Sequence, residues 1–233
     1  MPIKSPALSG GIETYILLIW IFVIFSHILT LLLCYLYLSI RKAWVKEHSS
    51  REFSNLMIEG LETERCRISR ELHDSVLPLV HGSEAYNLIR SICTDLMPPD
   101  FQRLSLKDAL AQHYVLFMKR SGIECVCSID EDVDFSGIKV ENQLHLYRMV
   151  QESFNNIEKH SKAKKAYLVV RRVSENVLFC VSDDGIGLIN NTENLGMKSI
   201  RQRAAIIGAN LDFISESGNG LMVRIEIPIR DIN

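Results

Sequence analysis

A histidine followed by an aspartate, His73-Asp74, stands in a densely charged stretch of this sequence. The same stretch carries apolar residues at steps of seven, four and seven: Leu61, Ile68, Leu72 and Leu79. This spacing predicts a helix with an apolar stripe, and it places His73 beside the stripe, where solvent reaches it. A histidine with a free ring nitrogen can attack a phosphoryl group while Asp74 takes or orients its proton. Taken alone, an ordinary surface histidine on a charged helix is the simpler interpretation.

A second charged stretch covers residues 151–160 and is also predicted to be helical. Glu152, Asn156 and Lys159 share one helical face by four- and three-residue spacing, and His160 follows them. Amide and carboxylate oxygens suit Mg²⁺, while lysine and histidine can neutralise phosphate charge. An exposed polar helix face explains this stretch equally well when it is considered by itself.

A carboxylate and two glycines follow an apolar strand predicted near residues 176–182. Gly185 and Gly187 let the backbone turn sharply and approach a flat ligand closely. Asp183, at the end of the strand, can accept a hydrogen bond from an adenine amino group. An ordinary Asp-Gly turn is the alternative.

Two further glycine-containing stretches come later in the chain. Leu195, Gly196 and Met197 open a predicted helix, where free backbone N–H groups favour phosphate. Gly218 and Gly220 precede the last predicted strand.

Together these stretches resemble the motifs of two-component sensor histidine kinases. E-R-x-R-I-S-R-E-L-H-D resembles the phospho-acceptor box of the subfamily typified by the nitrate and nitrite sensors and the desaturase-regulating thermosensor. Q-E-S-F-N-N-I-E-K-H resembles the N box of the GHKL ATPase superfamily, and V-S-D-D-G-I-G-L resembles its first glycine box. L-G-M-K-S-I-R-Q-R resembles the second glycine box, which forms a lid over ATP, and G-N-G resembles the last glycine motif. The resemblance covers about residues 60–228.

The resemblance implies an enzyme, an ATP-dependent protein-histidine kinase. ATP and Mg²⁺ would bind between Asn156, Asp183 and the Gly196 lid, with Asn156 as the magnesium ligand and Glu152 near the phosphates. The γ-phosphoryl group would pass to His73 and then to an aspartate of a response regulator. In this subfamily the regulator usually carries a helix-turn-helix output domain.

Two positions depart from the family pattern. Asn194 stands where the lid usually has a further glycine, which changes the expected flexibility of the lid. Pro78 stands where the subfamily usually has glutamine or asparagine, whose amide is thought to position a water that dephosphorylates the regulator. Since proline offers no side-chain donor or acceptor, we expect little phosphatase activity.

Residues 15–40 contain no charged residue and exceed the length that a helix needs to cross a bilayer. Arg41, Lys42 and Lys46 follow directly, against only Lys4 before the run. The positive-inside bias predicts a single-pass helix in the cell (inner) membrane, with the N-terminus outside and the kinase part in the cytoplasm. The net charge of −2 argues against direct nucleic-acid binding through bulk charge.

We expect an α+β chain of 233 residues in four parts. These are an extracytoplasmic tail (1–13), a transmembrane helix (14–40), a linker helix with the dimerisation and phospho-acceptor domain (41–100), and an ATPase domain (101–233). Residues 41 to about 90 are predicted as one long helix loosened at Pro78, with a second helix around Glu84 to Leu96. One copy cannot cover the apolar stripe of such a hairpin, which predicts a homodimeric four-helix bundle. From about residue 106, helices and neighbouring strands predict an α/β sandwich with its helices on one face of a sheet, and the resemblance makes this the GHKL (Bergerat) fold.

Two rival classes remain. A GHKL ATP-binding switch that acts by capturing a partner would lack the histidine box on a dimerising helix. A pseudokinase scaffold would be expected to lose Asn156, Asp183 or His73, and all three are present.

Overall fold

The computed structural model describes residues 6–188, 194–215 and 218–228, with side chains described except at residues 6–13, 43 and 47–51. The chain divides into two compact units, Met1–Leu56 and Met57–Asn233, each described below by itself. The elements follow in the order α1 (Pro6–Glu71), the π-helical turn η1 (Leu72–Val76), α2 (Glu84–Leu96), α3 (Leu106–Ser121), β1 (Glu124–Ile129), α4 (Val140–Asn156), the π-helical turn η2 (Ile157–Ser161), β2 (Lys165–Val173), β3 (Asn176–Asp183), α5 (Leu195–Ile207), β4 (Asn210–Ser215) and β5 (Leu221–Pro228).

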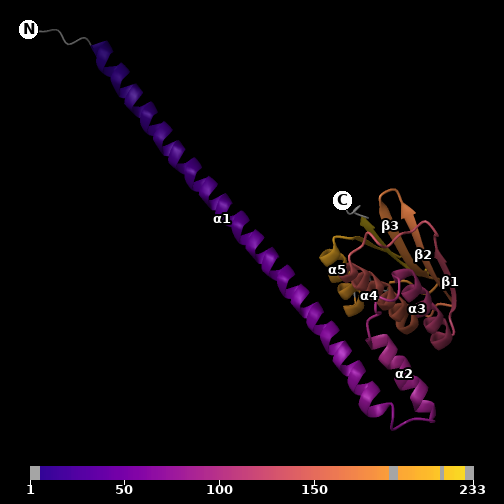
Figure 1. Ribbon diagram of the computed structural model, residues 1–233. Coiled ribbons are helices and arrows are strands. Elements are labelled where there is room, and N and C mark those ends of the chain that lie inside the picture. The colour runs from indigo at the N-terminus through magenta and orange to yellow at the C-terminus, as the bar shows by residue number, and fades with distance from the viewer. Residues whose placement is uncertain (1–5, 189–193, 216–217, 229–233) are drawn as a thin grey trace, which may run out of the picture. The chain divides into compact units, whose positions relative to one another are not determined.

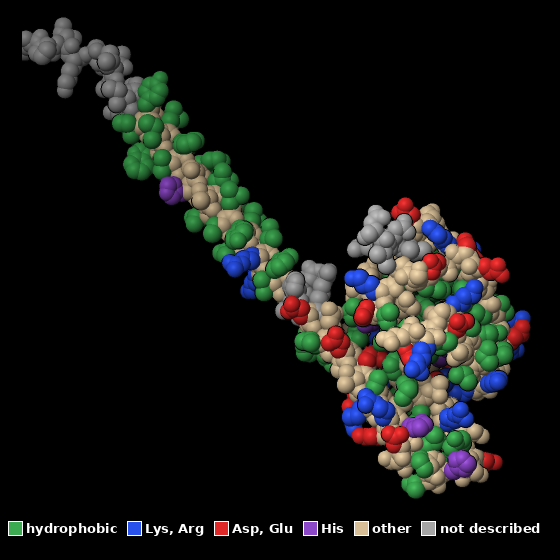
Figure 2. All heavy atoms as spheres, viewed as in Figure 1, with side chains coloured by type: hydrophobic (Ala, Val, Ile, Leu, Met, Phe, Trp, Pro, Cys, Tyr) green, Lys and Arg blue, Asp and Glu red, His purple; other side chains and the backbone are tan. Residues whose placement is uncertain are grey.

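The first unit is the N-terminal part of α1. Its segment Thr14–Lys46 is 33 residues long and apolar enough to cross a membrane by length and composition. Figure 2 shows hydrophobic side chains along this segment, followed by a group of basic side chains. The ring of His27 within it bonds the Val23 carbonyl oxygen at 2.8 Å, so its Nδ1 atom is satisfied by the helix itself. α1 has no backbone break at either end of the apolar run, and side-chain type alone marks its limits.

The second unit begins with a helical hairpin. α1 ends at Glu71, and the chain reverses through η1 and residues 77–83 before α2 begins. The expectation of one helix to about residue 90 is therefore wrong, whereas the expected second helix at Glu84–Leu96 is confirmed. Pro78 gives the physical reason, because it has no N–H to continue the helix and its ring would clash with the carbonyl four residues earlier. Just before it, the Leu77 N–H bonds the Leu72 carbonyl at 2.9 Å, a wider π-helical step.

The rest of this unit is a five-stranded sheet with helices on one side (Figure 1). The strand order is β1-β2-β3-β5-β4; β1 runs parallel to β2 and the other neighbours are antiparallel. Alternate residues of the strands are buried, as in β3, where Val177, Phe179 and Val181 are at most 1% exposed. The rings of Phe117 in α3 and Phe154 in α4 lie 4.7 Å apart in the same core. The predicted sheet with helices on one face is confirmed, and β2 and β3 form an antiparallel hairpin within it.

Candidate nucleotide and phospho-acceptor sites

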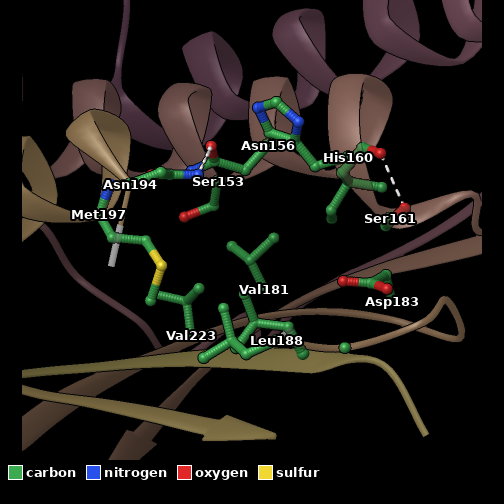
Figure 3. A pocket seen from close by; sticks show the side chains of 13 residues that line it. Ser153, Asn156, His160, Ser161, Val181, Asp183, Leu188, Asn194, Met197 and Val223 are labelled. Carbon is green, nitrogen blue, oxygen red and sulfur yellow. Dashed lines mark hydrogen bonds between the residues drawn. The ribbon is translucent and has the colours of Figure 1, made fainter. Parts of the chain in front are cut away.

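A pocket opens beside the C-terminal half of α4, the C-terminal end of β3, the start of α5 and the start of β5 (Figure 3). Of the predicted site residues, those that line it are Asn156, His160, Asp183, Gly187 and Met197. Apolar side chains form much of the remaining wall: Ile157, Val181, Leu188, Leu221 and Val223. The pocket therefore combines a largely apolar lining with a few polar groups, the usual character of a small-molecule site.

Asp183 supplies a buried carboxylate to this pocket. Its side chain ends β3, is 7% exposed and accepts a hydrogen bond from the Gly185 N–H at 2.8 Å. Burial raises the pKa of the Asp183 carboxyl, while the backbone N–H groups of Gly185 and Leu221 oppose the rise. A carboxylate held in an apolar wall gains from a ligand that donates a hydrogen bond to it.

The neighbouring Asp184 bonds to the backbone at the start of β2. Its Oδ1 atom accepts hydrogen bonds from the backbone N–H groups of Lys164 and Lys165, both at 2.8 Å. These bonds, the Lys165 contact foremost, lower the pKa of Asp184. Asp184 fixes the start of β2 and is not among the pocket-lining residues, so only the first aspartate of the pair faces the site.

Glycine is required sterically where the pocket's loops meet. A Cβ atom on Gly220, whose φ is +78°, would lie 1.8 Å from the Asp183 carbonyl oxygen. A Cβ atom on Gly185 would lie 2.2 Å from the Ser161 carbonyl oxygen, which accepts a hydrogen bond from the Ile186 N–H at 2.9 Å. The end of η2, the loop after β3 and the loop before β5 are thereby packed backbone against backbone, and no side chain fits between them.

The start of α5 meets α4 through Gly196. A Cβ atom there would lie 2.2 Å from Glu152 Oε1 and 3.0 Å from Asn156 Oδ1. Asn194, the departure from the lid pattern, caps α5 by accepting the Met197 N–H at 2.8 Å. Its Nδ2 atom also donates to Asn156 Oδ1 at 3.2 Å. Asn194 thus holds both the helix start and the predicted magnesium ligand, while residues 189–193 of the lid lie outside the described residues.

Seven predicted ATP-site residues do not line the pocket: the three tightly packed glycines Gly185, Gly196 and Gly220, and also Glu152, Lys159, Leu195 and Gly218. Glu152 borders Gly196, whereas the Leu195 side chain is 85% exposed. Lys159 lies in η2, where the wider π-helical turn invalidates spacing arguments based on an α-helix. It is exposed, while His160 in the same turn does reach the pocket wall.

His73 lies in η1, and its side chain is 64% exposed, as the sequence predicts. Its Nδ1 atom is 3.0 Å from Asp74 Oδ1, which leaves Nε2 to act as a nucleophile. His73 borders a separate hollow with α2 and α3, in which the buried ring of His113 has its pKa lowered to about 4, chiefly by desolvation. Among the described residues, none lines both this hollow and the nucleotide pocket.

Several known proteins with similar sequences are named sensor histidine kinases. No family model matches the chain. It is 26% identical over 202 residues to "Sensor histidine kinase LiaS" of Bacillus subtilis and 25% identical over 215 residues to "Oxygen sensor histidine kinase NreB" of Staphylococcus carnosus. These matches cover 72% and 78% of this chain, and 55% and 61% of the two relatives. "Sensor histidine kinase MctS" of Rhizobium johnstonii is 31% identical over 204 residues, which cover 71% of this chain and 43% of that protein. Over about 70% of its length, the chain is thus similar to proteins named sensor histidine kinases.

The solved structures agree in fold. The histidine kinase domain of the blue-light activated histidine kinase of Erythrobacter litoralis matches 72% of this chain and 94% of the solved chain, with a TM-score of 0.51 and 21% identity. The chain spans only about half the length of the curated relatives it matches.

Two arginines shortly before His73 bond to groups of their own helix. Arg67 pairs with Glu64 and Glu71 on the surface of α1. Arg70 donates to the Cys66 carbonyl oxygen at 3.3 Å.

Sequence reasoning missed a buried ionic cluster in this chain. Glu62 of α1 bonds Arg148 of α4 and Arg203 of α5. The available signal was an arginine within an apolar helical run, Leu-Tyr-Arg-Met-Val, because an arginine on a buried helix face needs a partner. The sequence does not indicate that the partner is Glu62.

Proposed function

We propose that this chain is a membrane-anchored sensor histidine kinase that binds ATP with Mg²⁺, phosphorylates itself on His73 and passes the phosphoryl group to an aspartate of a response regulator. The observation that carries the proposal is the coexistence, in one compact unit, of the Asp183 pocket and the exposed His73-Asp74 pair. A partner-capturing ATP switch needs only the pocket, and a scaffold needs neither.

The pocket suits ATP for three reasons. Asp183 offers an acceptor for an adenine amino group between apolar walls. Gly185 and Gly220 allow the backbone to close tightly around that wall, and Gly196 brings the start of α5 against Glu152 and Asn156. The N-terminus of α5, beginning at Leu195, provides backbone N–H groups for phosphate.

The residues present also fit Mg²⁺. Asn156 Oδ1 would ligate the ion, with Glu152 close by through the contacts around Gly196. Magnesium in phosphoryl-transfer sites usually takes one or two protein oxygens and fills its shell with water and phosphate, so a larger cluster of ligands is not needed. When bound, the ion supplies neutralisation of phosphate charge.

His73 would act through Nε2, while Asp74 holds Nδ1 and fixes which nitrogen is free. Its exposure suits a group that must meet first a nucleotide and then a second protein. The resemblance to the subfamily favours a regulator with a helix-turn-helix output domain and no direct nucleic-acid contact by the kinase itself.

Dimerisation and membrane anchoring complete the proposal. Leu61, Ile68 and Leu79 of the predicted apolar stripe are 53%, 36% and 84% exposed in the single chain, which favours burial between two copies in a four-helix bundle. Thr14–Lys46 would cross the cell membrane once, with the N-terminus outside and the kinase part in the cytoplasm. Protease treatment of sealed spheroplasts tests this orientation: the kinase part should be protected until the cells are lysed.

The deciding experiment incubates the full chain, in lipid nanodiscs, with γ-labelled ATP and Mg²⁺. We expect label that is lost in acid, retained in base and mapped to the peptide containing His73. Nucleotide binding without labelling would favour the ATP-binding switch, and absence of both would favour the scaffold. A matched control uses His81→Gln, which changes an exposed histidine of the same hairpin whose ring contacts Tyr86.

A further inference from the structure

A buried ionic cluster joins α1, the helix that leads into His73, to α4 and α5. These two helices flank the nucleotide pocket, and together with the sheet that they cover they are called the ATP-binding layer below. Glu62 Oε2 accepts from Arg148 Nε at 3.0 Å, and Glu62 Oε1 accepts from an Arg203 terminal nitrogen at 2.7 Å. The three side chains are 13%, 2% and 6% exposed in the order Glu62, Arg148, Arg203. A single carboxylate thus neutralises two buried guanidinium groups, one on α4 and one on α5.

The two arginines depend on Glu62 to different degrees. Arg148 also donates to the carbonyl oxygens of Asp95 and Leu96 at 3.0 and 2.8 Å and to Gln151 Oε1 at 2.7 Å. It thereby satisfies backbone carbonyls that the C-terminus of α2 leaves unpaired. Arg203 has, besides Glu62, a contact of 3.4 Å with the ring of His145. Loss of the carboxylate at position 62 would therefore affect Arg203 most.

The face of α1 that enters this cluster differs from the predicted dimer stripe. Ile58, Glu62 and Ser69 are α1 positions turned inward, with Ile58 and Ser69 at 3% and 0% exposure. At 100° per residue they lie on average about 90° around the helix from Leu61 and Ile68. One helix can therefore hold its own ATP-binding layer and a second copy of the chain at the same time.

We propose that Glu62 is a releasable latch that holds the ATP-binding layer against α1 in a resting arrangement. The proposal rests on the proposed function, because it gives the latch a role in delivering phosphate to His73. Among the described residues, the nucleotide pocket and the His73 hollow share no lining residue, so we expect the layer to move before its nucleotide meets the histidine of the same chain. Glu62 precedes His73 by about three helical turns on the side of the apolar segment. A rotation of α1 that begins in that segment reaches Glu62 first.

Electrostatics make this contact suitable as a latch. Buried arginines that lose their carboxylate are strongly unfavourable, whereas the same groups in water carry no such penalty. Removing the charge at Glu62 therefore destabilises the docked arrangement specifically, since undocking returns Arg203 to solvent. The remaining bonds of Arg148 keep the end of α2 on α4 in either arrangement.

The test compares Glu62→Gln with Glu64→Gln in the full chain in nanodiscs. Both variants neutralise a carboxylate of α1, but the Arg67 partner of Glu64 lies on the same helix. We expect Glu62→Gln to raise the initial rate of His73 labelling at saturating ATP about fivefold or more, with the ATP affinity changed less than twofold. Glu64→Gln should stay near the wild-type rate.

Arginine modification by phenylglyoxal gives a readout that does not depend on activity. Arg203 should be modified slowly in the wild type and several times faster in Glu62→Gln, with Arg103, 88% exposed, as the internal reference. Arg203→Met, which removes the other half of the latch, should raise the labelling rate as well, and the double variant should exceed neither single variant.

Three results separate the possibilities. Unchanged protection of Arg203 in Glu62→Gln overturns the latch, and so does a labelling rate that falls or stays constant in both single variants. If the wild type takes no label at all, the proposed function fails, while the accessibility of Arg203 still decides whether Glu62 holds the layer closed.

Discussion

The two candidate sites of this chain are built in opposite ways. The proposed nucleotide pocket draws on α4, η2, β3, α5 and β5, and its carboxylate Asp183 is 7% exposed. The proposed phospho-acceptor pair lies within one π-helical turn, and His73 is 64% exposed and bonded to its sequence neighbour. A ligand that must be enclosed needs groups brought together from many elements, whereas a nucleophile that must meet several partners is better made locally and left in solvent.

This contrast explains how each site should respond to substitution. Changes in the pocket should act through packing and ligand affinity, because its walls interlock backbone against backbone. Substitution of His73 should abolish phosphoryl transfer and leave the fold intact, because its side chain is mostly exposed. The predictions below follow from this difference.

The largest effect is expected for His73→Gln. Labelling from ATP should fall below detection, because the nucleophilic nitrogen is lost, while nucleotide affinity stays within twofold of the wild type. Labelling assays and titration with a fluorescent ATP analogue measure the two quantities. Stable label retained at another residue would show that the phospho-acceptor is wrongly assigned, and His81→Gln should behave as the wild type.

Gly220→Ala should damage the pocket through packing. The new Cβ atom would overlap the Asp183 carbonyl oxygen and a left-handed backbone would be strained, so we expect about 4 kcal/mol of lost stability and loss of ATP binding. Gly208→Ala is the matched control, since Gly208 has a similar φ of +68° with no atom within 4 Å of the new Cβ atom. It should cost only about 1–2 kcal/mol. Equal losses of stability in chemical denaturation would remove the steric explanation.

Asp183→Ala should weaken ATP binding roughly 10- to 100-fold, the value of a hydrogen bond to a charged acceptor, and reduce discrimination against GTP. Asp184→Ala should leave nucleotide affinity near wild type, because Asp184 bonds the start of β2 and not the pocket. Calorimetric titration with both nucleotides provides the comparison. A wild type that binds ATP and GTP equally would refute the role of Asp183 as the adenine acceptor.

Pro78 gives a prediction at the local site. We expect the wild type to transfer phosphate to its regulator with little phosphatase activity, and Pro78→Gln to raise dephosphorylation about fivefold if an amide there orients water. Because Pro78 ends the helix, the substitution should also extend the helical structure past η1. The assay adds kinase, ADP and Mg²⁺ to purified phosphorylated regulator. Rapid loss of phosphate with the wild type would contradict the prediction.

The smallest effect concerns Asn194→Gly, which restores the residue expected in the lid. It removes the bond to Asn156 Oδ1, so the Mg²⁺ concentration for half-maximal ATP binding should rise about threefold. Asn194→Ser keeps a helix cap but is too short to reach Asn156, and it should show the same rise. If serine preserves the wild-type value, capping of α5 is the role of Asn194 and orientation of Asn156 is not.

Local sequence determined much of this chain. The glycine and aspartate motifs marked the pocket, and apolar periodicity marked the helices and strands. The exposure of His73 was predictable because side-chain spacing within one helix is a short-range property. The same short-range reasoning extended the first helix past Pro78 to about residue 90, whereas α1 ends at Glu71 and the π-helical turn after it ends at Val76.

Tertiary structure decided what depends on distant partners. Asp183 lines the pocket and Asp184 does not. Lys159 lies in a π-helical turn and does not line the pocket either. Asn194, which departs from the family pattern, caps α5 and bonds Asn156. Tertiary structure also joined Glu62 to Arg148 and Arg203, which are 86 and 141 residues away along the chain. No local pattern encodes such pairs, because a buried charge takes whichever opposite charge the packed elements bring within reach.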